Sequence, residues 1–201
     1  MNKTTKDRLY IVTILFFALG FFNIAFAWLG LVCFTLPFVL LAKDKQKTWC
    51  KHYCPRSKLL TLAGKAGKVH RPIPALLRKA ATKRFVLAYF IVNMTVAALS
   101  TVMVALSGAA PMEKLRFLLA FQLPWQMPDL LALSQMPGWV VHGSFRIYSM
   151  FMTTTVIGLV LGYFYKPRTW CTICPVNTIS DMALAGEKRE SAPKQRPVYT
   201  D

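Results

Sequence analysis

The sequence predicts an all-α integral membrane protein with four transmembrane helices, arranged as two parallel two-helix repeats with an interfacial outer loop. Of the 201 residues, 55% are hydrophobic and 16% are charged, whereas soluble domains carry about 25% charged residues. The mean hydropathy is +0.40. The apolar residues form long runs, which is typical of membrane-spanning helices and differs from the alternating pattern of an outer-membrane barrel. Basic residues gather between these runs.

The first apolar run predicts a helical hairpin. Residues 9–42 contain no charged side chain over 34 positions. As one helix this run would be about 51 Å long, whereas the hydrocarbon core of a bilayer is about 30 Å thick. We therefore expect two short spans that turn around residues 22–25. Arg8 and Lys43, at the two ends of the run, can extend their charged groups to the membrane surface and relieve the short length.

Two further spans are expected at residues 85–109 and 147–165. The loop between them contains tryptophans and prolines among short apolar pieces, a composition that favours segments lying in the membrane interface. The chain thus divides into a first repeat with a basic loop (1–84), a second repeat with the outer loop (85–184) and a polar tail (185–201). We expect the tail to be disordered.

The basic residues predict the orientation. In the four-span arrangement, 22 of the 25 Lys and Arg residues fall on one face, and the positive-inside rule makes that face cytoplasmic. Both termini are then cytoplasmic in a bacterial-type inner membrane. The net charge of +17 is explained by topology and membrane lipid, with docking of an acidic redox protein as a second use. No recognised nucleic-acid-binding motif accompanies these residues, so we expect no nucleic-acid partner.

One cysteine signature occurs twice, each time after an apolar run. Both copies begin with Trp-Cys and end with Cys-Pro, and they comprise Trp49, Cys50, Cys54, Pro55 and Trp170, Cys171, Cys174, Pro175. Both copies follow an even-numbered span, so the repeats are expected to be parallel and to place the two motifs together at the cytoplasmic end. Four thiolates make the full ligand set of a tetrahedral iron or zinc site or of an iron–sulfur cluster.

Each motif predicts a helix start, with cysteine at the cap and proline at the first helical position. A thiolate there is stabilised by free backbone N–H groups and by the helix dipole, so we expect a lowered cysteine pKa. Four nearby cations are expected to offset the negative charge: Lys51, Arg56, Lys58 and Arg168. The two tryptophans either shield the metal or anchor at the headgroups. His52 is expected to be a solvated loop residue, and Cys33 an apolar packing residue within a span.

Several alternatives follow from the cysteines alone. Iron is favoured, as one ion or as a cluster, and a structural zinc site is the main competitor. Disulfides are disfavoured in the reducing cytoplasm, and no thioredoxin-like pattern supports thiol exchange. Haem between histidines is disfavoured because no histidine lies within a predicted span. A small transporter is the weakest option, because the predicted spans lack buried ionisable residues.

The paired Trp-Cys…Cys-Pro patterns resemble the membrane 4Fe-4S binding proteins of the NapH and NosR type. The second motif is one residue shorter than the first, and the ferredoxin-like cysteine runs and flavin domain of larger members are lacking. The resemblance implies that Cys50, Cys54, Cys171 and Cys174 bind the cofactor. It further implies electron transfer between the quinone pool or a cytoplasmic donor and an enzyme outside the membrane.

The expected function is membrane-bound electron transfer, as an oxidoreductase subunit rather than a stand-alone enzyme. The expected partners are a flavoprotein, a ferredoxin or an extracytoplasmic reductase. A quinone is a candidate second cofactor, because a site at the cytoplasmic edge leaves most of the roughly 30 Å hydrocarbon core uncrossed. The competing hypothesis is a non-redox membrane subunit or assembly factor with a structural four-cysteine zinc site.

Overall fold

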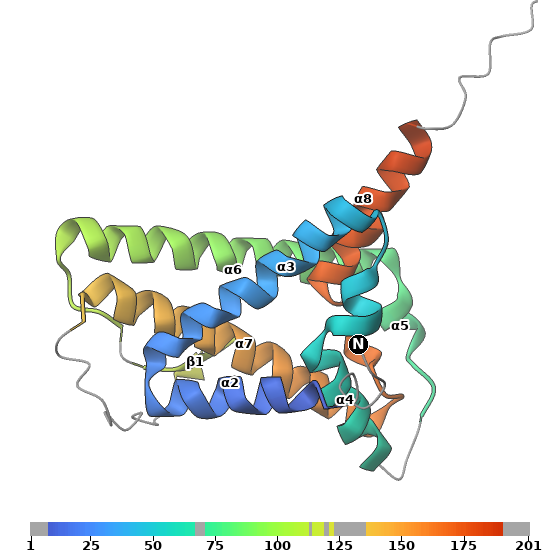
Figure 1. Cartoon of the computed structure of the whole chain (residues 1–201), viewed down its shortest axis with the longest axis horizontal. Coiled ribbons are helices and arrows are strands. Elements are labelled where there is room, and N and C mark those ends of the chain that lie inside the picture. The colour runs from blue at the N-terminus through green and yellow to red at the C-terminus, as the bar shows by residue number, and fades with distance from the viewer. Residues whose placement is uncertain (1–7, 67–70, 113, 119–120, 123–135, 191–201) are drawn as a thin grey trace, which may run out of the picture.

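The protein is mostly helical (Figure 1). The computed structural model describes residues 8–66, 71–112, 114–118, 121–122 and 136–190. Its elements, in chain order, are α2 (Tyr10–Phe22), η1 (Ile24–Trp28), α3 (Leu29–Asp44), η2 (Trp49–Tyr53), α4 (Pro55–Ala66), α5 (Ala75–Arg78), α6 (Ala80–Ser107), β1 (Arg116–Phe117), β2 (Phe121–Gln122), α7 (Gly138–Phe164), η4 (Thr169–Thr172) and α8 (Pro175–Glu190).

The first apolar run folds as the predicted hairpin. Asn23 is extended, with φ −149° and ψ 118°, and its side chain accepts a hydrogen bond from the Ala25 N–H at 2.9 Å. This local bond competes with helix continuation, so α2 ends at Phe22 and the chain reverses into η1 and α3. The turn expected at residues 22–25 is confirmed.

Within the part of the chain that the structure describes, three helical segments are long and apolar enough to cross a membrane. They are Ile24–Asp44, Ala80–Ser107 and Gly138–Phe164, with 21, 28 and 27 residues. The 13 residues of α2 give a length of about 20 Å, which is short of the roughly 30 Å hydrocarbon core. Four transmembrane helices were expected, the first two of them short. Three helices of the described chain are long and apolar enough to span, and α2 is a shorter apolar helix.

Two helix starts differ from the sequence prediction. Helix α6 begins at Ala80 rather than at residue 85, and α7 begins at Gly138 rather than at residue 147. Hydropathy alone missed the first part of α7 because that part carries polar side chains. His142 has partners inside the protein: its Nε2 lies 3.0 Å from Ser100 Oγ, and its Nδ1 accepts from the Met112 N–H at 3.1 Å.

This correction changes two sequence-based arguments. His142 and Arg146 both lie on the long apolar helix α7, whereas the predicted spans contained neither histidine nor buried ionisable residues. The argument against a transporter from an absence of such residues was therefore wrong. The tail prediction also changes, since α8 continues to Glu190. Its last residues include Glu187, Lys188 and Arg189, which are good helix formers. Residues 191–201 of the predicted tail lie outside the described residues.

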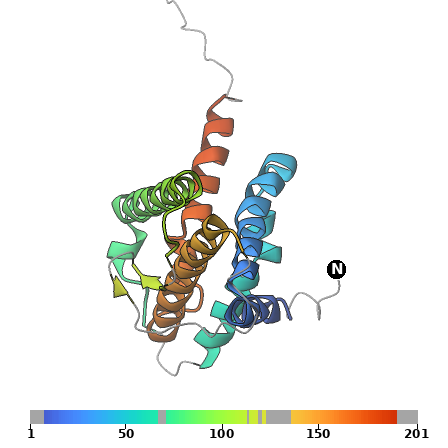
Figure 2. The ribbon, with the colours of Figure 1, turned by 90° about the vertical axis from the view of Figure 1, so that its left-hand side faces the viewer.

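Helix α7 occupies the centre of the bundle. Figure 2 shows it between α6 on one side and the α2–α3 hairpin on the other. Its buried residues form one apolar cluster with residues of η1 and of the outer loop. The members of this cluster are Ile24, Ala27, Leu115, Val141, Phe145, Ile147, Tyr148, Met150 and Phe151. Partly buried residues of α2, α3 and α6 pack against this cluster, so the other three apolar helices share a surface that α7 provides.

Part of the outer loop packs on α7. Strands β1 and β2 pair antiparallel, with Arg116 opposite Gln122 and Phe117 opposite Phe121. Leu115, which precedes β1, is only 4% exposed within the protein. This segment therefore lies against the bundle. Residues 119–120 and 123–135 of the loop that was expected to be interfacial lie outside the described residues.

Close packing of α2 on α7 requires a small residue at Gly20. A Cβ atom at this position would overlap the Tyr148 ring at Cε2, and the Tyr148 hydroxyl donates to the Phe17 carbonyl at 3.1 Å. We predict that Gly20→Ala destabilises the protein by about 1–3 kcal/mol, the usual cost of overpacking. Thermal unfolding in detergent measures this. The matched control is Gly186→Ala, where an added Cβ meets no atom within 4 Å. Equal stabilities of the two variants would contradict the close contact.

Candidate metal centre

The two cysteine motifs lie at the same end of the bundle. Figure 1 shows α4 and α8, the helices that follow the two motifs, at one end of the bundle. The α2–α3 turn, the end of α6 and the start of α7 lie at the other end. Cys50 lies in η2, and Cys54 directly precedes α4. Cys171 lies in η4, and Cys174 directly precedes α8. The helix starts expected at Pro55 and Pro175 are confirmed.

A small apolar contact holds the two motifs at a fixed separation. Leu60 of α4 is 2% exposed and packs in one cluster with Trp170 of the second motif. Gly158 of α7 permits this approach, since a Cβ there would lie 3.0 Å from Leu60 Cδ2 and 3.4 Å from Trp170 Cγ. The helix that begins at the first motif is thereby fixed to the turn that carries the second.

Polar contacts also join the two motifs. The Arg168 guanidinium donates to the Cys50 carbonyl at 3.2 Å. Lys47, just before the first motif, donates to Asn177 Oδ1 at 2.9 Å and forms an ion pair with Asp181, both on α8. The Lys47 and Asp181 side chains are 21% and 50% exposed, so each of these links contributes modestly. They set orientation more than stability.

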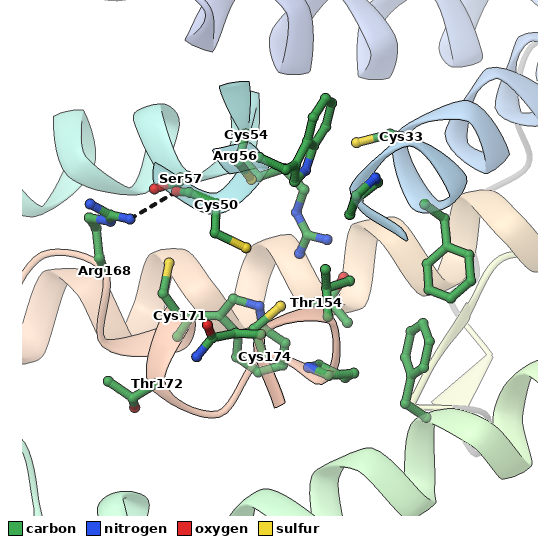
Figure 3. A pocket seen from close by; sticks show the side chains of 18 of the residues that line it. Cys33, Cys50, Cys54, Arg56, Ser57, Thr154, Arg168, Cys171, Thr172 and Cys174 are labelled. Carbon is green, nitrogen blue, oxygen red and sulfur yellow. Dashed lines mark hydrogen bonds between the residues drawn. The ribbon is translucent and has the colours of Figure 1, made fainter. Parts of the chain in front are cut away.

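All four motif cysteines line one cavity of about 560 Å³ (Figure 3). Cys33 of α3, which was expected to be only a packing residue, lines the same cavity (Figure 3). Nothing in the sequence around Cys33 signals this position, because it follows from how the hairpin folds back. Trp49 and Trp170 also line the cavity, which favours shielding over headgroup anchoring as their role. His52 is exposed, as expected.

Two kinds of site need four thiolates held at different separations. In the described part of the chain, no three His, Cys, Asp or Glu side chains are grouped closely enough to hold one metal ion. A tetrahedral zinc site, with Zn–S near 2.3 Å, would need sulfur atoms about 3.8 Å apart. An iron–sulfur cluster holds its thiolates farther apart, because iron and sulfide lie between them. The cavity of about 560 Å³ has room for a cluster, and its four motif thiols supply the donor set that a cluster needs.

Burial governs the acidity of these thiols. It raises the pKa of Cys50 to about 11 and of Cys54 to about 12, and it raises the pKa of Cys174 as well. The lowered pKa expected from the helix starts was wrong for these three residues. A backbone hydrogen bond at Ser57 does lower the pKa of Cys54, but loss of hydration outweighs it. Without a bound cation these thiols are protonated at neutral pH, so loading of the site releases protons.

Of the four cations expected to offset the site, Arg56 enters the cavity most directly. Its guanidinium lies with Cζ 5.6 Å from the centre of the Phe151 ring and points into the cavity (Figure 3). Its buried Nη2 has no hydrogen-bond partner. Lys51 is exposed, and it lines, with Lys58 and Arg168, a second hollow of about 150 Å³ beside Cys50 and Cys54. Positive charge therefore borders the thiols from two sides.

Comparison with known proteins gives one family match. The 4Fe-4S binding domain family matches residues 26–74 and 148–193, the two segments that carry the four motif cysteines. The chain is thus similar to an iron–sulfur-binding domain over these two segments, and this likeness favours an iron–sulfur cluster over zinc. No curated protein and no solved structure matches the chain significantly. The three long apolar helices of the described part of the chain are compatible with a membrane location.

Proposed function

We propose that the protein is a membrane-bound electron-transfer subunit that holds one 4Fe-4S cluster between its two motifs. The proposed ligands are Cys50, Cys54, Cys171 and Cys174. The observation that carries this proposal is the common cavity: two cysteine pairs about 120 residues apart in the sequence line the same space. When bound, the cluster supplies reversible one-electron chemistry.

The surrounding residues suit this task. The indoles of Trp49 and Trp170 line the cavity, where their apolar rings would shield a bound cluster from water. Trp170 is 7% exposed and packs in one apolar cluster with Leu60. Four thiolates in a poorly hydrated site carry a large negative charge that is costly unless cations are near. Arg56 and Arg168 place two positive charges at the cavity wall.

The membrane arrangement that we propose keeps both cysteine motifs on the cytoplasmic side. Helix α2 would act as a fourth, short span, and the two hairpins would form parallel repeats. The support is the distribution of charge, since 22 of 25 basic residues fall on the motif side in this arrangement. The likeness to the NapH and NosR type remains part of this proposal. So do its implied partners: a cytoplasmic ferredoxin or flavoprotein, the quinone pool, or an extracytoplasmic reductase.

The cavity itself suggests how electrons reach the membrane interior. Its far wall is apolar and is formed by residues of α3, α6 and α7, namely Phe34, Pro37, Phe90, Met150 and Phe151. The cluster site would thus open toward the bundle core rather than only toward the cytoplasm. A partner or a quinone approaching within the membrane would meet this wall first.

Serine substitution of the ligands tests the proposal. We predict that Cys50→Ser and Cys171→Ser abolish the electron paramagnetic resonance signal of the reduced cluster, because each removes one of four ligands. Cys33→Ser is the matched control: this thiol lines the same cavity but belongs to neither motif, so its variant should keep the signal. Size-exclusion profiles show whether the variants stay folded. A full signal in either ligand variant would overturn the assignment.

A second prediction concerns charge at the cavity. Arg56→Gln should lower the reduction potential of the cluster, because a nearby positive charge favours the reduced, more negative state. Arg56→Lys should restore part of the shift. Arg78→Gln, which changes an exposed arginine on α5, is the control and should leave the potential unchanged. A redox titration followed by electron paramagnetic resonance measures all three. Equal potentials in wild type and Arg56→Gln would show that Arg56 does not act on the cluster.

A further inference from the structure

Two arginines lie close together where the outer loop packs on the first half of α7. Arg146 lies on α7, eight residues after its start at Gly138, and Arg116 begins β1 of the outer loop. Both line one small hollow together with Asn93 of α6 and with Ser149 and Thr153 of α7. Met112 and Met150 complete the lining. Met150 also lines the cysteine cavity, whereas the two arginines and the other polar residues do not.

The position of Arg116 is fixed by the packing of its strand on α7. Its backbone N–H donates to Ser149 Oγ at 3.1 Å, and the Leu118 N–H donates to Thr153 Oγ1 at 3.5 Å. The neighbouring Leu115 side chain is buried in the core cluster. Backbone hydrogen bonds and the buried Leu115 side chain therefore hold Arg116 beside Arg146, although the two positive side chains repel each other.

The two guanidinium groups lack a negative partner in the described part of the chain. The Nε atoms of Arg116 and Arg146 are both buried and have no hydrogen-bond partner. No carboxylate lines their hollow. Asp44 and Asp181 lie on α3 and α8, near the cysteine motifs. Two like charges that are partly withdrawn from water, with unsatisfied donors, are unfavourable unless an anion neutralises them.

We propose that this hollow binds a phosphate group, presented by a phospholipid headgroup or by free phosphate. Arginine pairs bind phosphate oxygens through forked, charge-assisted hydrogen bonds. The hollow has a volume of about 10 Å³, which is room for roughly one water-sized group. One phosphate oxygen would therefore enter between the arginines, and the rest of the molecule would stay outside. Asn93 and Ser149 add polar groups around that oxygen. The site is independent of the proposed cluster.

Lipid retention distinguishes the two sources of phosphate. The full chain is purified in detergent, washed extensively and assayed for phospholipid phosphorus per chain. Delipidated protein is then incubated with mixed micelles of phosphatidylglycerol and detergent, or with radiolabelled inorganic phosphate. We expect wild type to bind, and Arg146→Gln and Arg116→Gln to bind at least tenfold less, with Arg146→Lys recovering part of the loss. Arg78→Gln, on the exposed α5, should bind like wild type. Binding of phosphatidylglycerol alone identifies a lipid site, and binding of inorganic phosphate identifies a soluble ligand.

Two outcomes would overturn the proposal. One is binding in Arg146→Gln and Arg116→Gln equal to that of wild type. The other is no binding of either probe by wild type, and new binding in Glu113→Gln or Asp129→Asn would then explain that result. These two acidic residues of the outer loop lie outside the described residues, and that result would assign the arginines to an internal carboxylate. If Arg146→Gln does not fold, Arg116→Gln on the loop strand decides alone.

Discussion

The packing of Leu60 and Trp170 against α7 is the contact on which the rest of the site depends. It joins the helix that begins at the first cysteine motif to the turn that carries the second, and it uses Gly158 for the close approach. Neither motif offers more than two thiols by itself, so a four-thiol site exists only if this junction is rigid. The central position of α7 in the bundle provides that rigidity, because α7 contacts the first hairpin, α4 and α6 together.

Burial of the motif thiols opposes loading of a cluster but strengthens the effect of nearby charges on a bound cluster. It raises the pKa values of Cys50, Cys54 and Cys174, so the empty site holds protonated thiols and loading must displace protons. The same loss of hydration strengthens the interaction of a bound cluster with charges nearby. Arg56 is placed to use this effect, because its guanidinium enters the cavity with one nitrogen unpaired.

The sequence predicted the local features of the fold well. The turn at Asn23 and the helix starts at Pro55 and Pro175 follow from side-chain chemistry within a few residues, and all were confirmed. The start of α7 was missed because His142 obtains its partners from α6 and from the outer loop, which no local pattern reveals. The cavity position of Cys33, the raised thiol pKa values and the Arg116–Arg146 pair likewise arise from tertiary packing.

The central claim is that the four cysteines hold one cluster rather than one ion. Quantitative analysis of iron, acid-labile sulfide and zinc on the intact, anaerobically purified chain tests it most directly. The account predicts four iron atoms and four sulfides per chain, as in the matched 4Fe-4S binding domain, with negligible zinc. One equivalent of zinc, or of iron without sulfide, would contradict it.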